Sequence, residues 1–398
     1  MPIYNPGAEK QTRHLRKTPA LRFEHRSEAE DALKTVRAHT LRGHGGEGPG
    51  SQTAVVMVII NPVSGQGKAS QIYKKQIEPI LNAAGLQCIE FTTQYRGHAT
   101  EIVLNAKPGE YSMILSVGGD GTLYEVIQGI LNRPDWDEMR NVPLLQVPCG
   151  SGNALAACTG LWDVSTAAYA AVKGGIVPLD ICSVIQFGPD GRSLPRFYSF
   201  LSFAYGMLSC LDIGTEHLRW MGSTRFVVGA LQQIWQQKTF PVRVAYLEAT
   251  SMQDYGVTVL EREEGEGEEE EAPKGFGPQL HHFRELAKTC QVKAGPGIDR
   301  GEGLAATHST LPPGWLWMPA EEIQLFAACN LPRLDMNFHF APDAHASSGH
   351  LNLLYTAGKA GRRRGFELLT SSEKGNHMHL VEQHKPVALY IEPLAAGL

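Results

Sequence analysis

Residues 114–125 have the sequence Ile-Leu-Ser-Val-Gly-Gly-Asp-Gly-Thr-Leu-Tyr-Glu. The first four, mostly apolar, predict a buried strand, the glycines around Asp120 predict a tight turn, and residues 123–131 predict a helix. Because glycine leaves its N–H accessible, such a turn can lie against a phosphate, and the helix N-terminus that follows adds partial positive charge. The alternative is that Asp120, at or near the N-cap, only caps this helix.

A second glycine turn has the same form. Residues 144–147 predict a strand that runs into Pro148-Cys149-Gly150-Ser151-Gly152-Asn153 and then into helical residues 154–157. An earlier predicted strand, 55–60, leads into a loop that is not a P-loop, because Pro62 and Ala69 replace the Gly and Ser/Thr of that motif. Alternating strands and helices predict a parallel, doubly wound α/β sheet with ligands at the carboxyl ends of its strands. Two such turns at one crevice favour a nucleotide-phosphate site.

Size and composition limit the classes of protein to which the chain can belong. The chain of 398 residues is long enough for two domains, and its net charge of −5 gives no support for nucleic-acid binding. Seven scattered cysteines without a Cys-x-x-Cys pair suit a reducing compartment, so a cytoplasmic location is expected. The longest apolar run, 54–60, is far shorter than the ~20 residues of a spanning helix, so any membrane contact is expected to be peripheral. His377 and His379 are expected to be solvated loop residues, not metal ligands.

The pattern divides the chain into three segments. Residues 1–50 are expected to be disordered, with one short helix and a glycine-rich linker, and residues 51–178 to form the α/β nucleotide-binding domain. Residues 179–398 predict a mostly antiparallel β-sandwich domain with a flexible acidic insertion at about 250–312. Its predicted strands lie at 181–187, 198–205, 242–247, 323–329, 351–356 and 388–391. A helix is expected at 217–237 and a compact basic turn at Arg362-Arg363-Arg364.

Several motifs resemble the diacylglycerol-kinase-like lipid kinases. Gly119-Asp120-Gly121 and the stretch Gly150-Ser151-Gly152-Asn153 are similar to motifs of that whole superfamily. The motifs that resemble its sphingosine (long-chain base) kinase branch are Arg133-Pro134-Asp135-Trp136, Ala204-Tyr205-Gly206, Asp212, Arg219, Gly222 and Arg225-Phe226. The similarity covers about 54–247 and, more weakly, 315–393. It implies a kinase that uses ATP and Mg²⁺ to phosphorylate the primary hydroxyl of a sphingoid base, with residues 179–398 as the lipid-binding domain.

The resemblance also implies roles for individual residues. Asp120 corresponds to the catalytic base, and Asp212 to the aspartate that pairs with the amino group of the sphingoid base. The ATP site would comprise Asn61, Pro62, Val63, Thr93, Gln94, Tyr95, Arg96, Gly97, Glu125, Gly150, Ser151, Gly152, Arg219 and Arg225. The lipid substrate would lie against Gly118, Gly119, Asp120, Gly121 and Asp212, and no residue is assigned to Mg²⁺. At a helix N-terminus Asp120 is expected to have a low pKa, and Asp212 could instead be a turn residue or pair with Arg219.

Three alternatives stay open at this point. A diacylglycerol or ceramide kinase would act on lipids that have no free ammonium group for Asp212. A catalytically impaired lipid-binding relative is the second, because the family continues past the position of Leu398 into a strand bearing Asp-Gly-Glu. Without that strand an open sheet edge, low activity and self-association are expected. A dinucleotide oxidoreductase is poorly supported, because no G-x-G-x-x-G follows the first strand.

Overall fold

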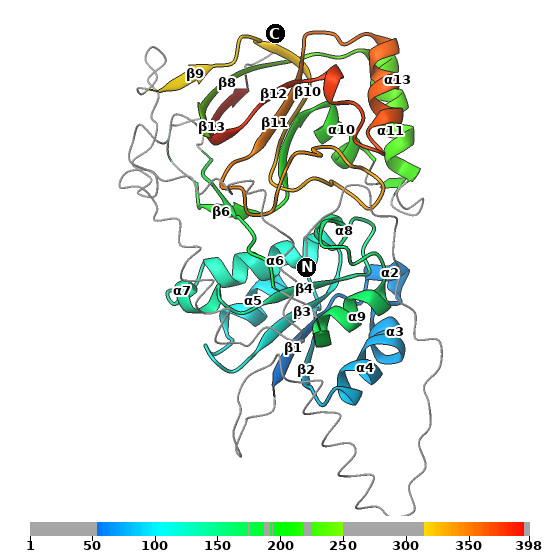
Figure 1. Ribbon diagram of the computed structural model, residues 1–398, viewed down its shortest axis with the longest axis vertical. Coiled ribbons are helices and arrows are strands. Elements are labelled where there is room, and N and C mark those ends of the chain that lie inside the picture. The colour runs from blue at the N-terminus through cyan, green and yellow to red at the C-terminus, as the bar shows by residue number, and fades with distance from the viewer. Residues whose placement is uncertain are drawn as a thin grey trace, which may run out of the picture. The chain divides into compact units, whose positions relative to one another are not determined.

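The computed structural model describes residues 54–393, with gaps at 174–175, 187–191, 193, 216, 219–223 and 250–313. These residues divide into two compact units, one up to Pro178 and one from Leu179 onward (Figure 1). The predicted N-terminal disordered segment, the acidic insertion and Arg219 lie outside the described residues.

The first unit is built on a four-stranded parallel sheet in the order β2-β1-β3-β4. Its strands are β1 (Val55–Ile60), β2 (Gln87–Thr92), β3 (Met113–Gly118) and β4 (Leu144–Pro148). Its helical elements are α2 (Ser64–Gly67), α3 (Ala69–Ile72), the π-helical η1 (Tyr73–Ile77), α4 (Glu78–Ala83), α5 (His98–Leu104), α6 (Asp120–Leu131), α7 (Trp136–Met139), α8 (Ala154–Cys158) and α9 (Val164–Lys173). Helices cover both faces of this sheet (Figure 1). The predicted doubly wound α/β fold is confirmed.

The two faces of the sheet bury separate cores, because successive side chains of a strand point to opposite faces. Val58 of β1 packs in one core with Tyr73, while its neighbour Ile59 packs in the other with Val103 and Val126. All of these side chains are fully buried. β3 lies between two partners and is buried along its whole length, so its carboxyl end has a fixed place at the edge of the sheet.

The second unit contains a seven-stranded antiparallel sheet along the path β12-β11-β10-β8-β13, with β7 paired to β10 and β9 to β8. Its strands are β7 (Ser202–Gly206), β8 (Phe240–Glu248), β9 (Trp315–Trp317), β10 (Glu322–Cys329), β11 (Asn352–Ala357), β12 (Glu382–His384) and β13 (Pro386–Pro393). A separate pair is formed by β5 (Cys182–Val184) and β6 (Phe197–Ser199). The helical elements are α10 (Met207–Gly214), α11 (Thr224–Gln236), α13 (Arg362–Ser371) and the 3-10 turn η4 (Met378–Leu380). The mostly antiparallel β domain predicted from the sequence is confirmed.

β10 is the strand on which this unit depends. Leu325 and Ala327 face a core that includes residues of α10, α11 and α13, whereas Phe326 and Ala328 face a core that includes residues of β8 and β11. Because both faces are covered, the strand is apolar almost throughout instead of alternating apolar with polar residues.

The backbone geometry of this unit explains why residue 206 is a glycine. It ends β7 with φ +72°, in the left-handed region, and a Cβ on it would stand 2.8 Å from the Gln324 carbonyl oxygen. Glycine is therefore required where the chain turns from β7 directly into α10.

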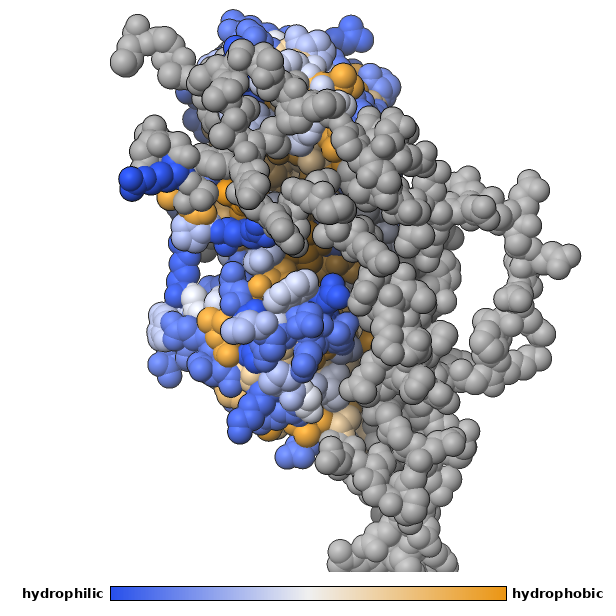
Figure 2. Space-filling model, turned by 90° about the vertical axis from the view of Figure 1, so that its left-hand side faces the viewer, coloured by the Kyte–Doolittle hydropathy of each residue, from blue (hydrophilic) through white to orange (hydrophobic). Residues whose placement is uncertain are grey.

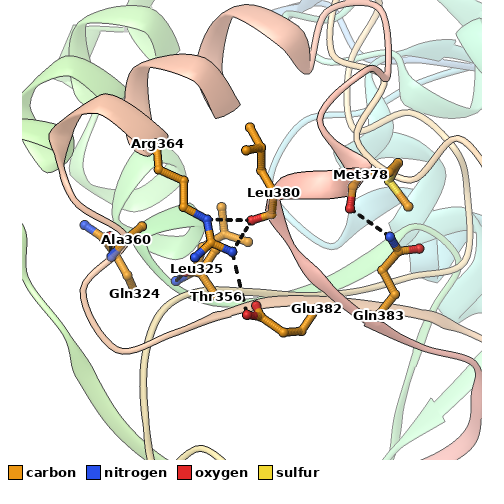
Figure 3. Close-up of polar contacts among 9 residues, drawn as sticks. All are labelled: Gln324, Leu325, Thr356, Ala360, Arg364, Met378, Leu380, Glu382 and Gln383. Carbon is orange, nitrogen blue, oxygen red and sulfur yellow. Dashed lines mark hydrogen bonds and ion pairs between the residues drawn. The ribbon is translucent and has the colours of Figure 1, made fainter.

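The basic residues at 362–364 begin helix α13, so the prediction of a turn is wrong. Arg364 donates to the Leu380 carbonyl through Nε at 2.9 Å and lies 3.6 Å from the Glu382 carboxylate (Figure 3). Arg362 lies over the ring of Trp235, 4.3 Å from its centroid. Arg364 thus fastens the helix to the sheet, and Arg362 joins α13 to α11.

The helix expected at 217–237 begins at Thr224 among the described residues. Asp212 lies within α10, so the alternative that it is a turn residue is also wrong. His379 is largely exposed, as expected, but the prediction for His377 is wrong. Its side chain is fully buried, stacked on Phe340, with Nε2 2.9 Å from the Phe340 carbonyl oxygen.

We predict that the second unit loses stability as the pH falls from about 6.5 towards 4. Burial, helped by nearby Arg333 and His377, lowers the pKa of His339 from 6.5 to about 4, so the unfolded chain binds this proton more readily than the folded one. The free energy of unfolding should decrease through this window by up to about 3 kcal/mol from this residue. Thermal melts of wild type and His339→Gln between pH 7.5 and 4 measure it. The variant should flatten the dependence, whereas His379→Gln, at an exposed position, should not.

Candidate active site

Asp120 stands where β3 passes into α6. Gly119 is the N-cap, Asp120 is the first helical residue, and the Asp120 N–H donates to the Gly152 carbonyl at 3.1 Å. Its side chain makes no capping bond to α6. The carboxylate instead accepts the N–H of Ala154, 2.9 Å from each oxygen, at the start of α8. The alternative that Asp120 caps its own helix is therefore wrong.

The environment of this carboxylate sets its proton affinity. Gln146 of β4 donates from Nε2 to Asp120 Oδ1 at 3.1 Å. Burial raises the pKa of Asp120 above its usual value, and the donors Ala154, Gln146 and Leu155 offset this rise only in part. The expected low pKa is wrong, because desolvation outweighs the favourable helix N-terminus. A carboxylate with a raised pKa is a stronger proton acceptor.

The two glycine turns lie directly against each other. A Cβ on Gly150 would stand 2.2 Å from the Gly119 Cα, and a Cβ on Gly119 would stand 2.9 Å from the Gly152 carbonyl oxygen. The second turn is closed by Asn153, which donates to the Gly150 carbonyl at 2.8 Å and accepts the Gly150 N–H at 2.9 Å. Backbones this close permit no side chain at either position, so the sequence prediction that these turns share one site is supported by their geometry.

The loop after β1 joins the same arrangement. Asn61 donates from Nδ2 to Thr122 Oγ1 of α6 at 3.0 Å, and its Oδ1 accepts the Val63 N–H at 3.2 Å. Val63 is 79% exposed at the tip. The predicted residues Asn61, Pro62 and Val63 are thus brought beside the first turn of α6.

Glu125 braces the loop that follows β2. Its carboxylate accepts the N–H of Gly97 at 2.9 Å and of Ala99 at 3.2 Å, and so caps the N-terminus of α5 from another helix. Within this loop Tyr95 stacks on His98, with ring centroids 4.7 Å apart, and is half exposed. The structure thus connects Glu125 to the predicted segment 93–97.

The predicted residues of the second unit are described less completely. Arg225 is buried on α11 and donates to Thr215 Oγ1 at 3.3 Å. Asp212 lies in α10, with its side chain outside the described part of the structure, as is the whole of Arg219. Their roles stay predictions.

Gln146, which contacts Asp120, was missed from the sequence, whereas Arg133 was identified there only as part of a motif. Gln146 is 1% exposed and bridges Asp120 to α8. The sequence feature that could have pointed to it is a single amide side chain within the apolar run of β4. Arg133 donates to the carbonyls of Val103 and Leu104 at 2.6 and 2.8 Å and pairs with Asp135. The Arg-Pro-Asp-Trp motif is thus a clamp between the C-terminal ends of α5 and α6.

The chemistry of the loops fits a bound nucleotide. Gly67 and Gly97 have φ of +79° and +91°, in the left-handed region, which favours glycine. Gly121 has no neighbour within 4 Å of where a Cβ would stand, apart from the backbone of its own helix and the adjoining residues. For Gly121, within a helix, glycine costs stability relative to alanine without relieving any clash. Space kept open beside a backbone suits close approach of a phosphate. The described residues hold no cluster of three His, Cys, Asp or Glu side chains; Mg²⁺ commonly uses one or two carboxylates together with substrate phosphates.

Comparison with known proteins finds relatives for the part of the chain that contains Asp120 and the two glycine turns. Residues 55–184 match the model of the diacylglycerol kinase catalytic domain. The chain is 37% identical to human sphingosine kinase 2 over 205 residues, which is 49% of this chain but 31% of that protein. It is 27% identical to human sphingosine kinase 1 over 354 residues, 86% of this chain and 82% of that one. It is also 37% identical to sphingoid long chain base kinase 4 of Schizosaccharomyces pombe over 182 residues, 46% of this chain and 38% of that one.

A solved structure of a putative diacylglycerol kinase from Bacillus anthracis shares the fold, with a TM-score of 0.53 and 15% identity over 88% of both chains. Residues 55–184 thus form a domain of the diacylglycerol kinase catalytic type, and the chain as a whole is similar to the lipid kinases of that family. Within that family its named relatives are sphingosine and sphingoid long chain base kinases.

We predict opposite effects for alanine at two glycines of the site. Gly150→Ala forces backbone apart at Gly119 and should destabilise the first unit by about 1–3 kcal/mol. Gly121→Ala meets no neighbour and improves helix propensity, so it should stabilise α6 by up to about 1 kcal/mol. Denaturant unfolding of both variants measures these changes. Equal stabilities would contradict the close contact of the two turns.

Proposed function

We propose that this chain is an ATP-dependent lipid kinase that phosphorylates the primary hydroxyl of a sphingoid long-chain base to give its 1-phosphate. The observation that carries the proposal is the partly buried carboxylate of Asp120, held by Ala154 and Gln146 beside two touching glycine turns. It lies at the carboxyl end of β3, where parallel α/β sheets bind ligands, and within the matched kinase domain.

Each residue has a limited task, since phosphoryl transfer depends mainly on positioning and charge stabilisation. Asp120 orients the lipid hydroxyl and accepts its proton, for which the raised pKa suits it. The glycine turns and the loop at Asn61 are the segments proposed to hold the phosphates. ATP, when bound with Mg²⁺, supplies the γ-phosphoryl group. Arg219 and Arg225 are the predicted phosphate-binding arginines.

The choice of substrate rests on the relatives and on Asp212. The relatives described above are named as sphingosine or long chain base kinases. Asp212 is the proposed partner of the substrate ammonium, which diacylglycerol and ceramide lack. A diacylglycerol or ceramide kinase is the second candidate, supported by the name of the matched domain.

We predict that Asp120→Asn abolishes turnover and leaves the fold intact. The Asn carbonyl oxygen can still accept from Ala154 and Gln146, but it cannot accept the substrate proton, so kcat should fall by at least ~10². Transfer of labelled phosphate from ATP to sphinganine, phytosphingosine, ceramide and diacylglycerol measures activity and substrate class together.

Labelling of the two free bases by the wild-type chain, lost in Asp120→Asn, supports the proposal. Labelling of diacylglycerol alone moves the assignment to the second candidate. A variant with wild-type kcat removes Asp120 from proton transfer.

Peripheral membrane contact has its own structural support. The described residues include no helix of the length and hydrophobicity that crossing a bilayer requires. α11 and α13 lie side by side at the edge of the second unit opposite β9 (Figure 1). Their exposed apolar side chains, here called the helix patch, are Val227, Val228, Leu231, Trp235 and Phe366.

The sequence positions of the helix patch explain its geometry. Val227, Leu231 and Trp235 are spaced by four residues and therefore share one side of α11. Trp235 is 68% exposed, with Arg362 over its ring. Tryptophan beside arginine suits the boundary between anionic headgroups and acyl chains. By contrast, the coloured surface in Figure 2, on the side of β9, is mostly hydrophilic with small groups of hydrophobic residues.

We predict that Trp235→Ala weakens binding to vesicles of phosphatidylcholine and phosphatidylserine by about tenfold, because one large apolar side chain no longer enters the interface. Sedimentation with vesicles measures the partition coefficient. Trp317→Ala is the matched control, since Trp317 of β9 is also exposed and also lies beneath an arginine, Arg243. Equal losses in the two variants would contradict a specific role for the helix patch.

A further inference from the structure

Gln146 is a polar side chain in an otherwise apolar strand. It lies in β4, opposite Ser116 of β3, and both are buried in the sheet. A buried amide is costly unless its donor and acceptor are both satisfied. The Gln146 side chain meets this requirement through hydrogen bonds to the Asp120 carboxylate and to the first turn of α8.

Its two hydrogen bonds fix the orientation of the amide. Nε2 donates to Asp120 Oδ1 at 3.1 Å, and Oε1 accepts the Ala156 N–H at 2.8 Å. A flipped amide would turn its oxygen towards the carboxylate and its NH₂ towards the Ala156 N–H, losing both bonds. The orientation of the Gln146 amide is therefore set by its two hydrogen-bond partners, Asp120 and Ala156.

Asp120 and Gln146 together hold the first turn of α8. The carboxylate accepts the Ala154 N–H, and the amide accepts the Ala156 N–H. Asn153, the N-cap residue, makes no side-chain cap and bonds to Gly150 instead. The start of α8, the amide and the carboxylate are thus one hydrogen-bonded unit, in which no member can rotate alone.

We propose that Gln146 is a positioning residue that sets both the orientation and the proton affinity of the Asp120 carboxylate. The inference rests on the proposed function, in which Asp120 accepts the substrate proton. A donor to one carboxylate oxygen stabilises the charged form and counters the effect of burial. It also directs the remaining lone pairs, which decides where a hydroxyl can be bound.

Few other groups affect the proton affinity of the Asp120 carboxylate. The contributions to the pKa of Asp120 are burial and the hydrogen bonds of Ala154, Gln146 and Leu155, with no charged side chain among them in the described parts of the chain. Cys149, beside the second glycine turn, is uncharged at neutral pH because burial raises its pKa to about 11. Gln146 is therefore the one side chain among these through which a substitution can alter this carboxylate.

The direct test is Gln146→Glu. A carboxylate there can still accept the Ala156 N–H but presents an oxygen, not a donor, to Asp120, so the pair must share a proton at low pH. The acidic limb of the kcat–pH profile for sphinganine phosphorylation should move up by at least one pH unit, with KM for ATP changed less than twofold. An unmoved acidic limb overturns the proposal.

The matched control is Gln324→Glu. Gln324 is 4% exposed in β10, and its Oε1 likewise accepts a backbone N–H, that of Ala360, at 2.9 Å (Figure 3). This variant buries the same carboxylate in the second unit, where the side-chain oxygen of Gln324 bonds to Ala360, and should leave the pH profile in place. A profile that moves equally in both variants reflects general destabilisation and overturns the proposal.

Gln146→Met covers the case in which the glutamate variant does not fold. Methionine keeps the length of the side chain without a charge and removes the donor to Asp120. The acidic limb should again move up, by less than in the glutamate variant. An unmoved limb in this variant counts against the proposal as well.

A second measurement does not require turnover. The melting temperature of Gln146→Glu should depend on pH between 4 and 8 more steeply than that of the double variant with Asp120→Asn, because the neutral amide removes the paired charge. Equal pH dependence overturns the coupling of Gln146 to Asp120. If the melts show that Gln146 is coupled to Asp120 but the wild-type chain transfers phosphate to no lipid, the proposed function is overturned. The coupling between the two residues then still stands.

Discussion

The contact of Gly119 with Gly150 is the constraint on which the site depends. β3 and β4 are neighbouring parallel strands in which Gly118 is opposite Pro148, so their carboxyl ends meet. The turns that follow can touch only because neither glycine has a Cβ. That contact brings the start of α8 onto Asp120, whose carboxylate accepts the Ala154 N–H.

Acidic side chains of α6 cap neighbouring helices instead of their own. Asp120 accepts from α8, and Glu125 accepts from α5. Helices as short as the five residues of α8 and the seven of α5 are marginal alone, so these carboxylates hold their N-termini in place. Asp120 therefore combines a structural bond with the proposed proton transfer, and the burial that both require also raises its pKa.

In the second unit, the main constraint is a central strand that is covered on both faces. β10 is buried on both faces, with helices on one side and strands on the other. α11 and α13 approach closely, since a Cβ on Gly365 would lie 3.1 Å from Ile234. This packing covers the inner sides of the two helices and leaves the helix patch outside, where apolar residues are unusual without a partner surface.

The sequence alone determined the two fold classes and the neighbourhood of Asp120, because strand periodicity and glycine turns are local signals. It did not determine what Asp120 contacts, since its partners Gln146 and Ala154 stand 26 and 34 residues away. The low pKa expected from the helix N-terminus was wrong for this reason: burial is a property of the whole unit. His377 and the arginines at 362–364 were misjudged likewise, because the stacking on Phe340 and the bond of Arg364 to Leu380 arise only when distant segments pack together.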